Sequence, residues 1–539
     1  MMHRTGLLAL FAALSVLHTW PLASNLSGLS RLDNDDGGLN LFVVSWIAHV
    51  VPRNPLGLFD APIFFPERYT LAYSEHMVVP SLMGAPFIWA GLSPITVYNL
   101  LVLAGFTLSG WAMALVVRRW TGSTLGGVTS GMLYAFNAHL LTRIVHLQAL
   151  HMEFLPVALL AFDQVLRVPV GSRELAVGSR GAVALASAFI LQALCSNYTL
   201  VFLSVALLTA AVVRADEWLG PGRTHRLVAL VAAGATAVAV LWPFLWPYYV
   251  VNRDQGLTRS IDEVALYSAS WSDYLATGGR LHFAWWSHRW FEGRTPLFPG
   301  VAAMVLAIAA LVEARAWRDR RVRMMAAMGI VGLALSFGPA LPGYSWLQGH
   351  VPLFEGLRAA ARWGLLPLTA VAILAGFGVS AWERRARGWT NWPAAAVALL
   401  AVVTLEALRA PMTFAGVPKI PAFYDALRAE PGVVLVEFPL FAGPSVSENA
   451  RYMVHSTRHF RPLVNGYSGF ETEAFRQRAG RWRRFPEPPV LQEMRELGVT
   501  HAVVDTNELS AAQVRAAAES PALELIAEED ARRLYRLAR

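Results

Sequence analysis

Charged residues are scarce in this chain of 539 residues, of which only 15% are Asp, Glu, Lys or Arg. Soluble domains carry about 25% charged residues on average, so an ordinary soluble enzyme and a disordered chain are both excluded. Cys195 is the only cysteine, which excludes a small fold stapled by disulfides. The sequence has no phosphate-binding glycine loop, dinucleotide fingerprint or HExxH zinc motif, and so it does not support cytosolic nucleotide chemistry or zincin proteolysis.

Apolar residues take the place of the missing charges, since 55% of the chain is hydrophobic and its mean hydropathy is +0.42. A helix of about 20 mostly apolar residues crosses a bilayer. Runs of this kind predict about eleven spanning helices in an α-helical polytopic membrane protein, with a transmembrane domain over residues 1–408. The predicted spans are 5–23, 94–118, 124–142, 151–167, 181–196, 198–213, 227–249, 298–313, 324–341, 363–382 and 391–408.

Positive charge comes almost entirely from arginine, because Lys419 is the only lysine. Basic residues mark the cytoplasmic loops of membrane proteins. If the predicted spans alternate in direction, Arg4, Arg118–Arg119 and the basic groups of the later loops fall on one side. We therefore expect a cytoplasmic N-terminus, with outer loops at residues 24–93 and 250–297.

Two apolar segments allow more than one interpretation. Residues 1–23 are interpreted as a retained anchor, with a cleaved signal peptide as the alternative. The stretch His76–Leu92 is apolar enough to span, but a crossing there would move Arg118–Arg119 to the outside. It is therefore predicted to be an interfacial or re-entrant helix on the outer side.

The chain changes character after residue 417, where strand and turn patterns replace the apolar runs. We predict a small extracytoplasmic α/β domain over residues 417–539. Its predicted strands are 432–438, 463–467, 499–505, 523–527 and 533–537, and its predicted helices are 471–484 and 488–497.

The densest polar cluster lies in the first outer loop, where Asp33, Asp35 and Asp36 occupy three of four positions. A second acidic position, Glu75, stands beside His76. Partial desolvation at a membrane surface raises the proton affinity of a carboxylate, which makes it a better base for an alcohol. The alternative is a solvated turn that caps the next helix. No cofactor is certain; a divalent metal such as Mg²⁺ or Mn²⁺ would suit three aspartates, but the wider ligand spacing of a calcium hand is missing.

Two basic residues, Arg358 and Arg362, come just before an apolar run on the predicted outer side. Four residues apart on a helix, they would share one face and suit a phosphate group, because a guanidinium fork binds two oxygens at once. Snorkelling anchors are the alternative. A further polar cluster near an outer turn includes His151 and Glu153, which are candidates for substrate binding or solvated residues of an interfacial turn.

The order of a first helix, a long outer loop, many spans and an outer C-terminal domain resembles that of one family, and so do several short sequence motifs. They are Asp36-Gly-Gly-Leu-Asn40, Ile63-Phe-Phe-Pro66, Leu71-Ala-Tyr-Ser-Glu75-His76, Gly356-Leu-Arg358 and Pro462-Leu-Val-Asn-Gly-Tyr467. The chain resembles the GT-C superfamily of polytopic membrane glycosyltransferases, which use polyprenyl-phosphate-linked sugars. It is most similar to bacterial membrane proteins grouped as YfhO-like or GT-C-like.

The resemblance implies an inverting glycosyltransferase of the bacterial cytoplasmic (inner) membrane, acting in cell-envelope polysaccharide biosynthesis. It implies that Asp36 is the general base and Glu75 a second catalytic acidic group. The implied partners are the lipid bilayer, a polyprenyl-phosphate-linked sugar donor and a glycan, lipid or protein acceptor, with no nucleic acid. The residues expected to bind substrate are His76, Arg358, Arg362, Asp33, Asp35, His151 and Glu153.

Two other classes of function stay open at this point. The chain could be a transporter or flippase-like component of envelope polysaccharide assembly, or a non-catalytic scaffold. Transporters usually show paired halves with broken helices and charges at the membrane midplane. Here the acidic groups gather in outer loops and the halves differ, which favours transfer chemistry. That chemistry requires the acidic loop and the arginines to converge outside the membrane barrier.

The predicted orientation can be tested with topology reporters. A reporter fused after the last residue is expected to read extracytoplasmic, and one inserted near Arg318 cytoplasmic, because the arginine-rich loops define the inner side. The opposite result would place the acidic first loop in the cytoplasm and contradict an outer active site.

Overall fold

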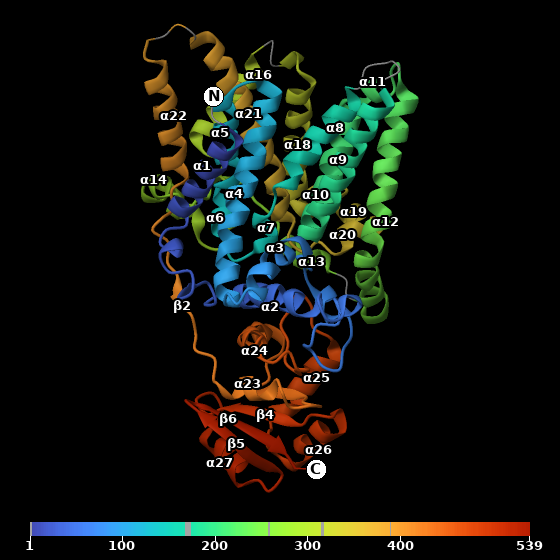
Figure 1. The fold of residues 1–539 in the computed structure, drawn as a ribbon, viewed down its shortest axis with the longest axis vertical. Helices are drawn as coiled ribbons and strands as arrows, with labels where there is room; N and C mark the ends of the chain where they lie inside the picture. The colour runs from blue at the N-terminus through green and yellow to red at the C-terminus, as the bar shows by residue number, and fades with distance from the viewer. Residues whose placement is uncertain are drawn as a thin grey trace. The chain divides into compact units, whose positions relative to one another are not determined.

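The computed structural model describes residues 3–167, 174–256, 259–313, 317–386, 388 and 390–538. Most of these residues are helical (Figure 1). Contacts divide the chain into two compact units: a helical bundle of Met1–Ser24, Leu100–Pro243 and Thr258–Thr413, and a second unit of Asn25–Asn99, Phe244–Leu257 and Phe414–Arg539. This division differs from the predicted domains 1–408 and 417–539, because the first loop belongs with the C-terminal segment.

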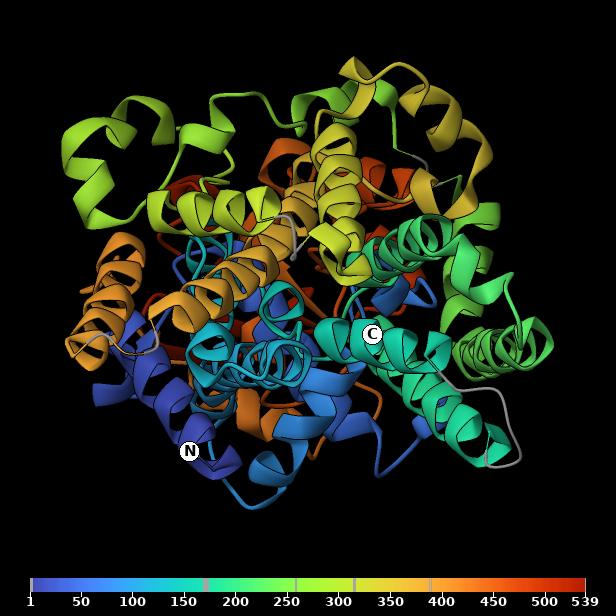
Figure 2. The ribbon, with the colours of Figure 1, turned by 90° about the horizontal axis from the view of Figure 1, so that it is seen from above.

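The long helices of the bundle form wherever the sequence has its apolar runs. They are α1 (Arg4–His18), α4 (Pro94–Thr121), α5 (Thr124–Ala135), α8 (Phe154–Leu166), α9 (Glu174–Cys195), α10 (Asn197–Val213), α12 (Arg223–Gln255), α16 (Val301–Val312), α18 (Arg320–Ser336), α21 (Leu365–Ala386) and α22 (Trp392–Ala407). The unit boundaries fall inside α4 and α12. Figure 2 shows α8 and α9, coloured teal, side by side as seen from above.

Short helices join the long ones. They are η1 (Leu22–Ser24), α6 (Ala138–Thr142), α7 (Leu147–Leu150), α11 (Ala215–Trp218), α13 (Ile261–Leu266), η4 (Asp273–Leu275), α14 (Arg280–His282), η5 (Phe283–Ser287), α15 (His288–Phe291), η6 (Gly338–Ala340), α19 (Tyr344–His350), α20 (Pro352–Glu355) and η7 (Ala360–Gly364). The predicted span 124–142 is interrupted, because the Asn137 side chain accepts a hydrogen bond from the Leu140 N–H and starts α6.

Four helical stretches among the described residues are long and apolar enough to cross a membrane. They are Pro94–Thr121, Leu147–Leu166, Arg223–Gln255 and Ala360–Ala386. Six shorter apolar helices accompany them, including α3 (Val78–Trp89) in the stretch predicted to lie at the interface. A helix of this length extends about 18 Å, well short of a hydrocarbon core of about 30 Å. The number of spans, about eleven, stays a prediction.

Glycines allow the bundle helices to approach one another closely. A Cβ atom on Gly126 of α5 would lie 2.6 Å from the Gly376 carbonyl oxygen of α21. Likewise, a Cβ atom on Gly378 would lie 2.1 Å from the Leu306 carbonyl oxygen of α16. Membrane helices gain little from the hydrophobic effect against lipid, so small residues that permit close packing hold them together.

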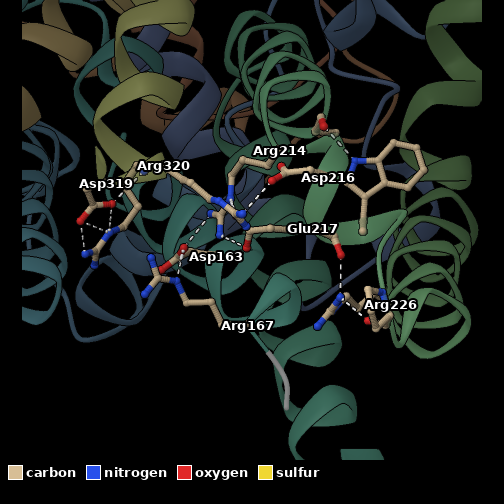
Figure 3. Close-up of polar contacts among 12 residues, drawn as sticks. Asp163, Arg167, Arg214, Asp216, Glu217, Arg226, Asp319 and Arg320 are labelled. Carbon is tan, nitrogen blue, oxygen red and sulfur yellow. Dashed lines mark hydrogen bonds and ion pairs between the residues drawn. The ribbon is translucent and has the colours of Figure 1, made fainter. Parts of the chain in front are cut away.

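Charged residues at one end of the bundle join three helices through buried ion pairs (Figure 3). Arg214, which is fully buried after α10, donates to the Asp163 carboxylate of α8 at 2.6 Å. It also donates to both oxygens of Glu217 in α11, at 2.8 and 2.7 Å. Arg320, the first residue of α18, contacts the same Glu217 at 2.9 Å. We call these four residues the Arg214 cluster.

The second unit contains the first loop and a small α/β domain. Its helices are α2 (Asp35–Val50), η2 (Pro55–Gly57), η3 (Thr70–Tyr73), α3, α23 (Phe423–Leu427), η8 (Gly443–Asn449), α24 (Ala450–Ser456), α25 (Glu473–Trp482), α26 (Pro488–Leu497) and α27 (Ala511–Glu519). Its strands are β1 (Leu29–Ser30), β2 (Ala415–Gly416), β3 (Leu435–Phe438), β4 (His501–Asp505), β5 (Leu523–Glu529) and β6 (Arg532–Leu537). The main sheet has the order β3-β4-β6-β5, in which β3 and β4 are parallel and the other pairs antiparallel.

The predicted strands and helices of the C-terminal domain are confirmed with one exception. Residues 463–467 do not form a strand; only Leu463 makes an isolated bridge, to Leu435 of β3. The reason is that the Asn465 side chain takes over the pairing: its amide group donates to the Glu437 carbonyl and accepts from the Glu437 N–H, at 2.8 and 2.7 Å. The backbone N–H and carbonyl of Leu463 and the carbonyl of Asn465 are therefore available to the first loop.

Arg214→Gln is expected to destabilise the bundle, because it leaves Asp163 and Glu217 buried with less positive charge beside them. Breaking a buried ion pair costs about 3–5 kcal/mol, which thermal unfolding in detergent can measure. Arg318→Gln removes an exposed arginine near the cluster and serves as the matched control. Equal melting temperatures of the two variants would contradict a stabilising role for the Arg214 cluster.

The same cluster predicts a pH dependence. Burial of Glu217 opposes its charged form, but the hydrogen bonds and charges of Arg214 and Arg320 outweigh burial and hold its pKa below the ordinary value of 4.5. A carboxyl group with a lowered pKa contributes stability above its unfolded pKa, and this contribution disappears as the pH falls. The wild-type melting temperature is therefore expected to drop more than that of Arg214→Gln when the pH is lowered below about 5.

Candidate functional site

Asp36 lies in the first turn of α2 and is half-buried. Asn34 is the N-cap of this helix, and its side chain accepts a hydrogen bond from the Asp36 N–H at 3.1 Å. The positive end of the helix dipole favours a carboxylate at this position. The helix-capping turn that the sequence allowed as an alternative is therefore present, and it holds Asp36 in place.

The Asp36 side chain receives a hydrogen bond from a residue 431 positions away. The Tyr467 hydroxyl donates to Asp36 Oδ1 at 2.7 Å. A hydrogen bond to an ionised acceptor is short and strong, and it fixes the direction in which the carboxylate points. Such an arrangement is suited to a base that must be oriented before it removes a proton.

Tyr467 is positioned by backbone pairing between the C-terminal segment and the first loop. The Phe64 and Phe65 N–H groups donate to the Asn465 and Leu463 carbonyls at 3.1 and 3.0 Å. In the reverse direction, the Leu463 N–H donates to the Pro62 carbonyl at 3.0 Å. Three of the sequence motifs that resemble the family thus lie close together around Asp36.

Two glycines permit this close fit. A Cβ atom on Gly466 would lie 2.5 Å from the Phe64 ring, where no side chain can be accommodated. A Cβ atom on Gly38, early in α2, would lie 3.3 Å from the Ala450 Cβ of α24. These contacts explain the presence of Gly38 shortly after Asp36 and of Gly466 directly before Tyr467.

The structure distinguishes the three aspartates of the first loop. Asp33 is exposed, and its Oδ1 forms an ion pair with Arg31 Nε at 3.1 Å. Asp35 is the first residue of α2. The Tyr467 hydroxyl approaches Asp36, which supports the choice of Asp36 among the three.

Glu75 and His76 are both buried, at 8% and 1% exposure. The His76 ring meets the edges of Phe59 and Tyr248, with centroids 6.5 and 6.0 Å apart. Burial lowers the pKa of His76 to about 4, so this ring is neutral at pH 7. A neutral imidazole adds no positive charge to a phosphate site, which leaves hydrogen bonding or orientation as the roles open to His76.

A second candidate site lies within the bundle, in a small pocket around Arg362. Tyr198 lies under the Arg362 guanidinium, with Cζ 4.3 Å from the ring centroid. Arg143 also lines the pocket and adds a second positive charge, and the rings of His139 and His146 lie on its wall as well. Its volume of about 20 Å³ has room for a water molecule, and a phosphate would therefore bind at its mouth.

Helix ends add to the positive character of this pocket. Arg362 lies at the start of the candidate span Ala360–Ala386, and His146 immediately precedes the span Leu147–Leu166. Ser196 and Tyr198 belong to the beginning of α10. Because helix N-termini carry partial positive charge, these beginnings favour an anion at the pocket.

The expected pairing of Arg358 with Arg362 on one helix face is wrong. Arg358 precedes η7 in a non-helical segment, because the Tyr198 hydroxyl accepts the backbone N–H groups of Arg358 and Ala359 at 3.1 and 3.2 Å. The Arg358 guanidinium instead faces Glu263, 3.8 Å away, and lies over the ring of Tyr267. The residues described around the pocket include Arg362 and not Arg358.

His151 and Glu153 are buried among the bundle helices. His151 Nδ1 is 3.0 Å from Glu153 Oε1, and its Nε2 is 3.1 Å from the Leu101 carbonyl oxygen. Gln192 of α9 donates to the His151 carbonyl at 2.9 Å. Neither His151 nor Glu153 is among the described residues that line the Arg362 pocket, and their contacts join helices.

Among the described residues, no group of three or more His, Cys, Asp or Glu side chains is arranged to hold a metal ion. Mg²⁺ is often held by one or two carboxylates together with substrate phosphates, so a divalent cation at the first-loop aspartates stays a prediction.

Comparison with known proteins identifies the fold of this chain. No family model and no curated protein sequence matches the chain. The solved structure of the Archaeoglobus fulgidus oligosaccharyltransferase in its apo form is similar over 94% of this chain and 70% of its own, with 13% identity and a TM-score of 0.53. This chain is a membrane protein with the GT-C fold. The structure of ArnT from Cupriavidus metallidurans bound to undecaprenyl phosphate matches 99% of this chain and 98% of its own, with 13% identity and a TM-score of 0.49.

In this GT-C protein, the predicted site residues fall in different units. Asp33, Asp35, Asp36, Glu75 and His76 belong to the second unit, whereas His151, Glu153, Arg358 and Arg362 belong to the bundle. Their expected convergence therefore stays a prediction.

Sequence reasoning missed several side chains that surround Asp36 and Arg362 in the structure. Tyr467 stands in a phrase that resembles the family, but no local pattern connects it with Asp36. Likewise, no local pattern connects Arg143, His146 or Tyr198 with Arg362. Their relation to Arg362 depends on the packing of helices that are far apart in the sequence.

Proposed function

We propose that this GT-C protein is a membrane glycosyltransferase of the inner membrane. It transfers a sugar from a polyprenyl-phosphate-linked donor to a hydroxyl group of a glycan, lipid or protein on the outer face. The observation that carries the proposal is the Asp36 carboxylate, held at a helix N-terminus and oriented by the Tyr467 hydroxyl. A fold alone does not fix a reaction, so the site chemistry carries the rest.

Asp36 is the general base of the proposed reaction. Its carboxylate takes the proton from the acceptor hydroxyl while that oxygen attacks the anomeric carbon of the donor sugar. The bond between the anomeric carbon and the phosphate oxygen breaks, and its electron pair leaves with the polyprenyl phosphate. A single displacement of this kind inverts the anomeric centre, and the proton gained by Asp36 balances the charge on the leaving group.

The Arg362 pocket is proposed to bind the phosphate of the donor. Arg362 and Arg143 supply positive charge, and the neighbouring helix N-termini add to it. The pocket lies where two candidate spans begin, and this is the level at which a lipid anchored in the bilayer carries its phosphate. Fixed positive groups of this kind stabilise the charge that develops on a leaving phosphate.

Asp36→Asn is expected to abolish sugar transfer while the protein stays folded, because an amide cannot accept the hydroxyl proton. General-base catalysis contributes about 10²–10⁴-fold, and a loss of kcat of that size is expected in detergent with the purified donor. Asp425→Asn, which changes an exposed carboxylate of the same unit, is the matched control. Normal turnover by Asp36→Asn would show that Asp36 is not the base, and unchanged envelope glycan in cells would favour a scaffold.

Tyr467→Phe tests the orienting role of the tyrosine. The variant removes one donor that stabilises the charged carboxylate, so the acidic limb of the pH–rate profile is expected to move to higher pH. Hydrogen bonds to charged groups contribute about 1.5–3 kcal/mol, and pH–rate profiles of the two proteins measure the displacement. A lower kcat with an unchanged pH profile would indicate a structural role only.

Arg362→Gln is expected to raise the KM for the lipid-linked donor about tenfold or more, because it removes a charge-assisted hydrogen bond to phosphate. Arg358→Gln removes a guanidinium that faces Glu263 and is expected to change this KM less. Initial rates at varied donor concentration measure both values. A larger effect from Arg358→Gln would reverse the assignment of the phosphate-binding residue.

A further inference from the structure

A groove lies between α1, α4 and α8, toward the end of α8 that is remote from the Arg362 pocket. Its volume is about 1000 Å³, at the upper end of the range of about 300–1,000 Å³ found for ligand sites. Apolar side chains from two helices form its long walls. They are Trp111, Ala112, Leu115 and Val116 of α4, and Val157 and Leu160 of α8.

One end of the groove is positively charged. Arg4 at the start of α1 and Arg118 and Arg119 in the last turn of α4 line it together with His3. The Trp111 indole N–H donates to the Arg4 carbonyl at 3.0 Å and fastens the start of α1 to α4. The described residues that line the groove include no aspartate or glutamate. A ligand of this site therefore meets basic groups at one end and an apolar wall along its length.

The position of the charged end relates the groove to the bilayer. Arg118 and Arg119 end the candidate span Pro94–Thr121, and Arg4 begins an apolar helix. The ends of spanning segments lie at the level of lipid headgroups. The groove thus extends from these charged helix ends along apolar faces of α4 and α8.

We infer that this groove binds one anionic phospholipid of the surrounding bilayer. The phosphate and its net negative charge contact Arg4, Arg118 and Arg119, and an acyl chain lies along the α4 and α8 walls. A water-soluble anion would leave the apolar walls unused. A zwitterionic phospholipid would bring a second, positive group toward the arginines, whereas an anionic one is attracted by each basic residue near it. This site is separate from the Arg362 pocket and does not depend on the proposed transfer reaction.

The test measures lipid occupancy by native mass spectrometry of the full-length protein in detergent, titrated with phosphatidylglycerol or phosphatidylcholine. The wild type is expected to retain phosphatidylglycerol in preference to phosphatidylcholine. Arg118→Gln combined with Arg119→Gln is expected to weaken phosphatidylglycerol binding about tenfold or more. The matched control, Arg384→Gln with Arg385→Gln, removes the same charge from the end of α21, where both arginines face Glu313.

A second variant tests the apolar wall. Leu160→Trp narrows the groove at a half-exposed position and is expected to weaken binding of phosphatidylglycerol without loss of charge. Circular dichroism and thermal melting establish that each variant is folded. Retention of the lipid by a folded Leu160→Trp protein would show that the tail does not lie along α8.

Three outcomes would overturn the inference. Equal binding of both phospholipids by the wild type would show that charge does not select the ligand. Equal loss in the Arg384 and Arg385 control would show a general effect of surface charge. Displacement of phosphatidylglycerol by undecaprenyl phosphate, in the wild type but not in the Arg118 and Arg119 variant, would identify the groove as a polyprenyl-phosphate site instead.

Discussion

The hydrogen bond from Tyr467 to Asp36 is the interaction on which the candidate active site depends. It joins the start of α2 to a segment 431 residues later, and it exists only because Phe64 and Phe65 pair with the backbone of Leu463 and Asn465. The glycines on either side permit this approach. A side chain at Gly466 would separate the two segments and remove the tyrosine from the carboxylate. The Asp36 carboxylate is thus held by packing as much as by its own position on the helix.

The two proposed anion-binding sites of the bundle follow one electrostatic principle. At the Arg362 pocket, arginines and helix N-termini combine beside the beginnings of two candidate spans. In the groove of α1, α4 and α8, arginines at a helix end combine with an apolar wall. Both places lie where spanning segments end, so a ligand with a charged head and a long apolar tail suits each of them. The two cavities differ in volume. The Arg362 pocket, at about 20 Å³, can contact only a headgroup, whereas the groove, at about 1000 Å³, has room for a whole lipid.

The bundle that carries these sites buries many apolar side chains, but this burial gains little free energy when the alternative is contact with lipid, because lipid is as apolar as leucine. Glycines at the α5–α21 and α16–α21 contacts bring backbones together, and the Arg214 cluster closes one end through buried ion pairs. Sequence patterns showed the arginines of this cluster on one predicted side. They did not show that Arg214 donates hydrogen bonds to both Asp163 and Glu217, because these contacts require α8, α11 and α18 to pack together.

The sequence by itself determined the helices, the C-terminal hairpin and the acidic turn that caps α2, because apolar periodicity, strand alternation and capping are local properties. It also indicated Asp36 and Arg362 as chemically useful residues. Only the tertiary structure decided that Tyr467 orients Asp36, that Arg358 turns toward Glu263 and away from the pocket, and that residues 463–467 pair with the first loop. Each of these depends on side chains or backbone groups from segments distant in the sequence, and such contacts are set by packing geometry that no local pattern records.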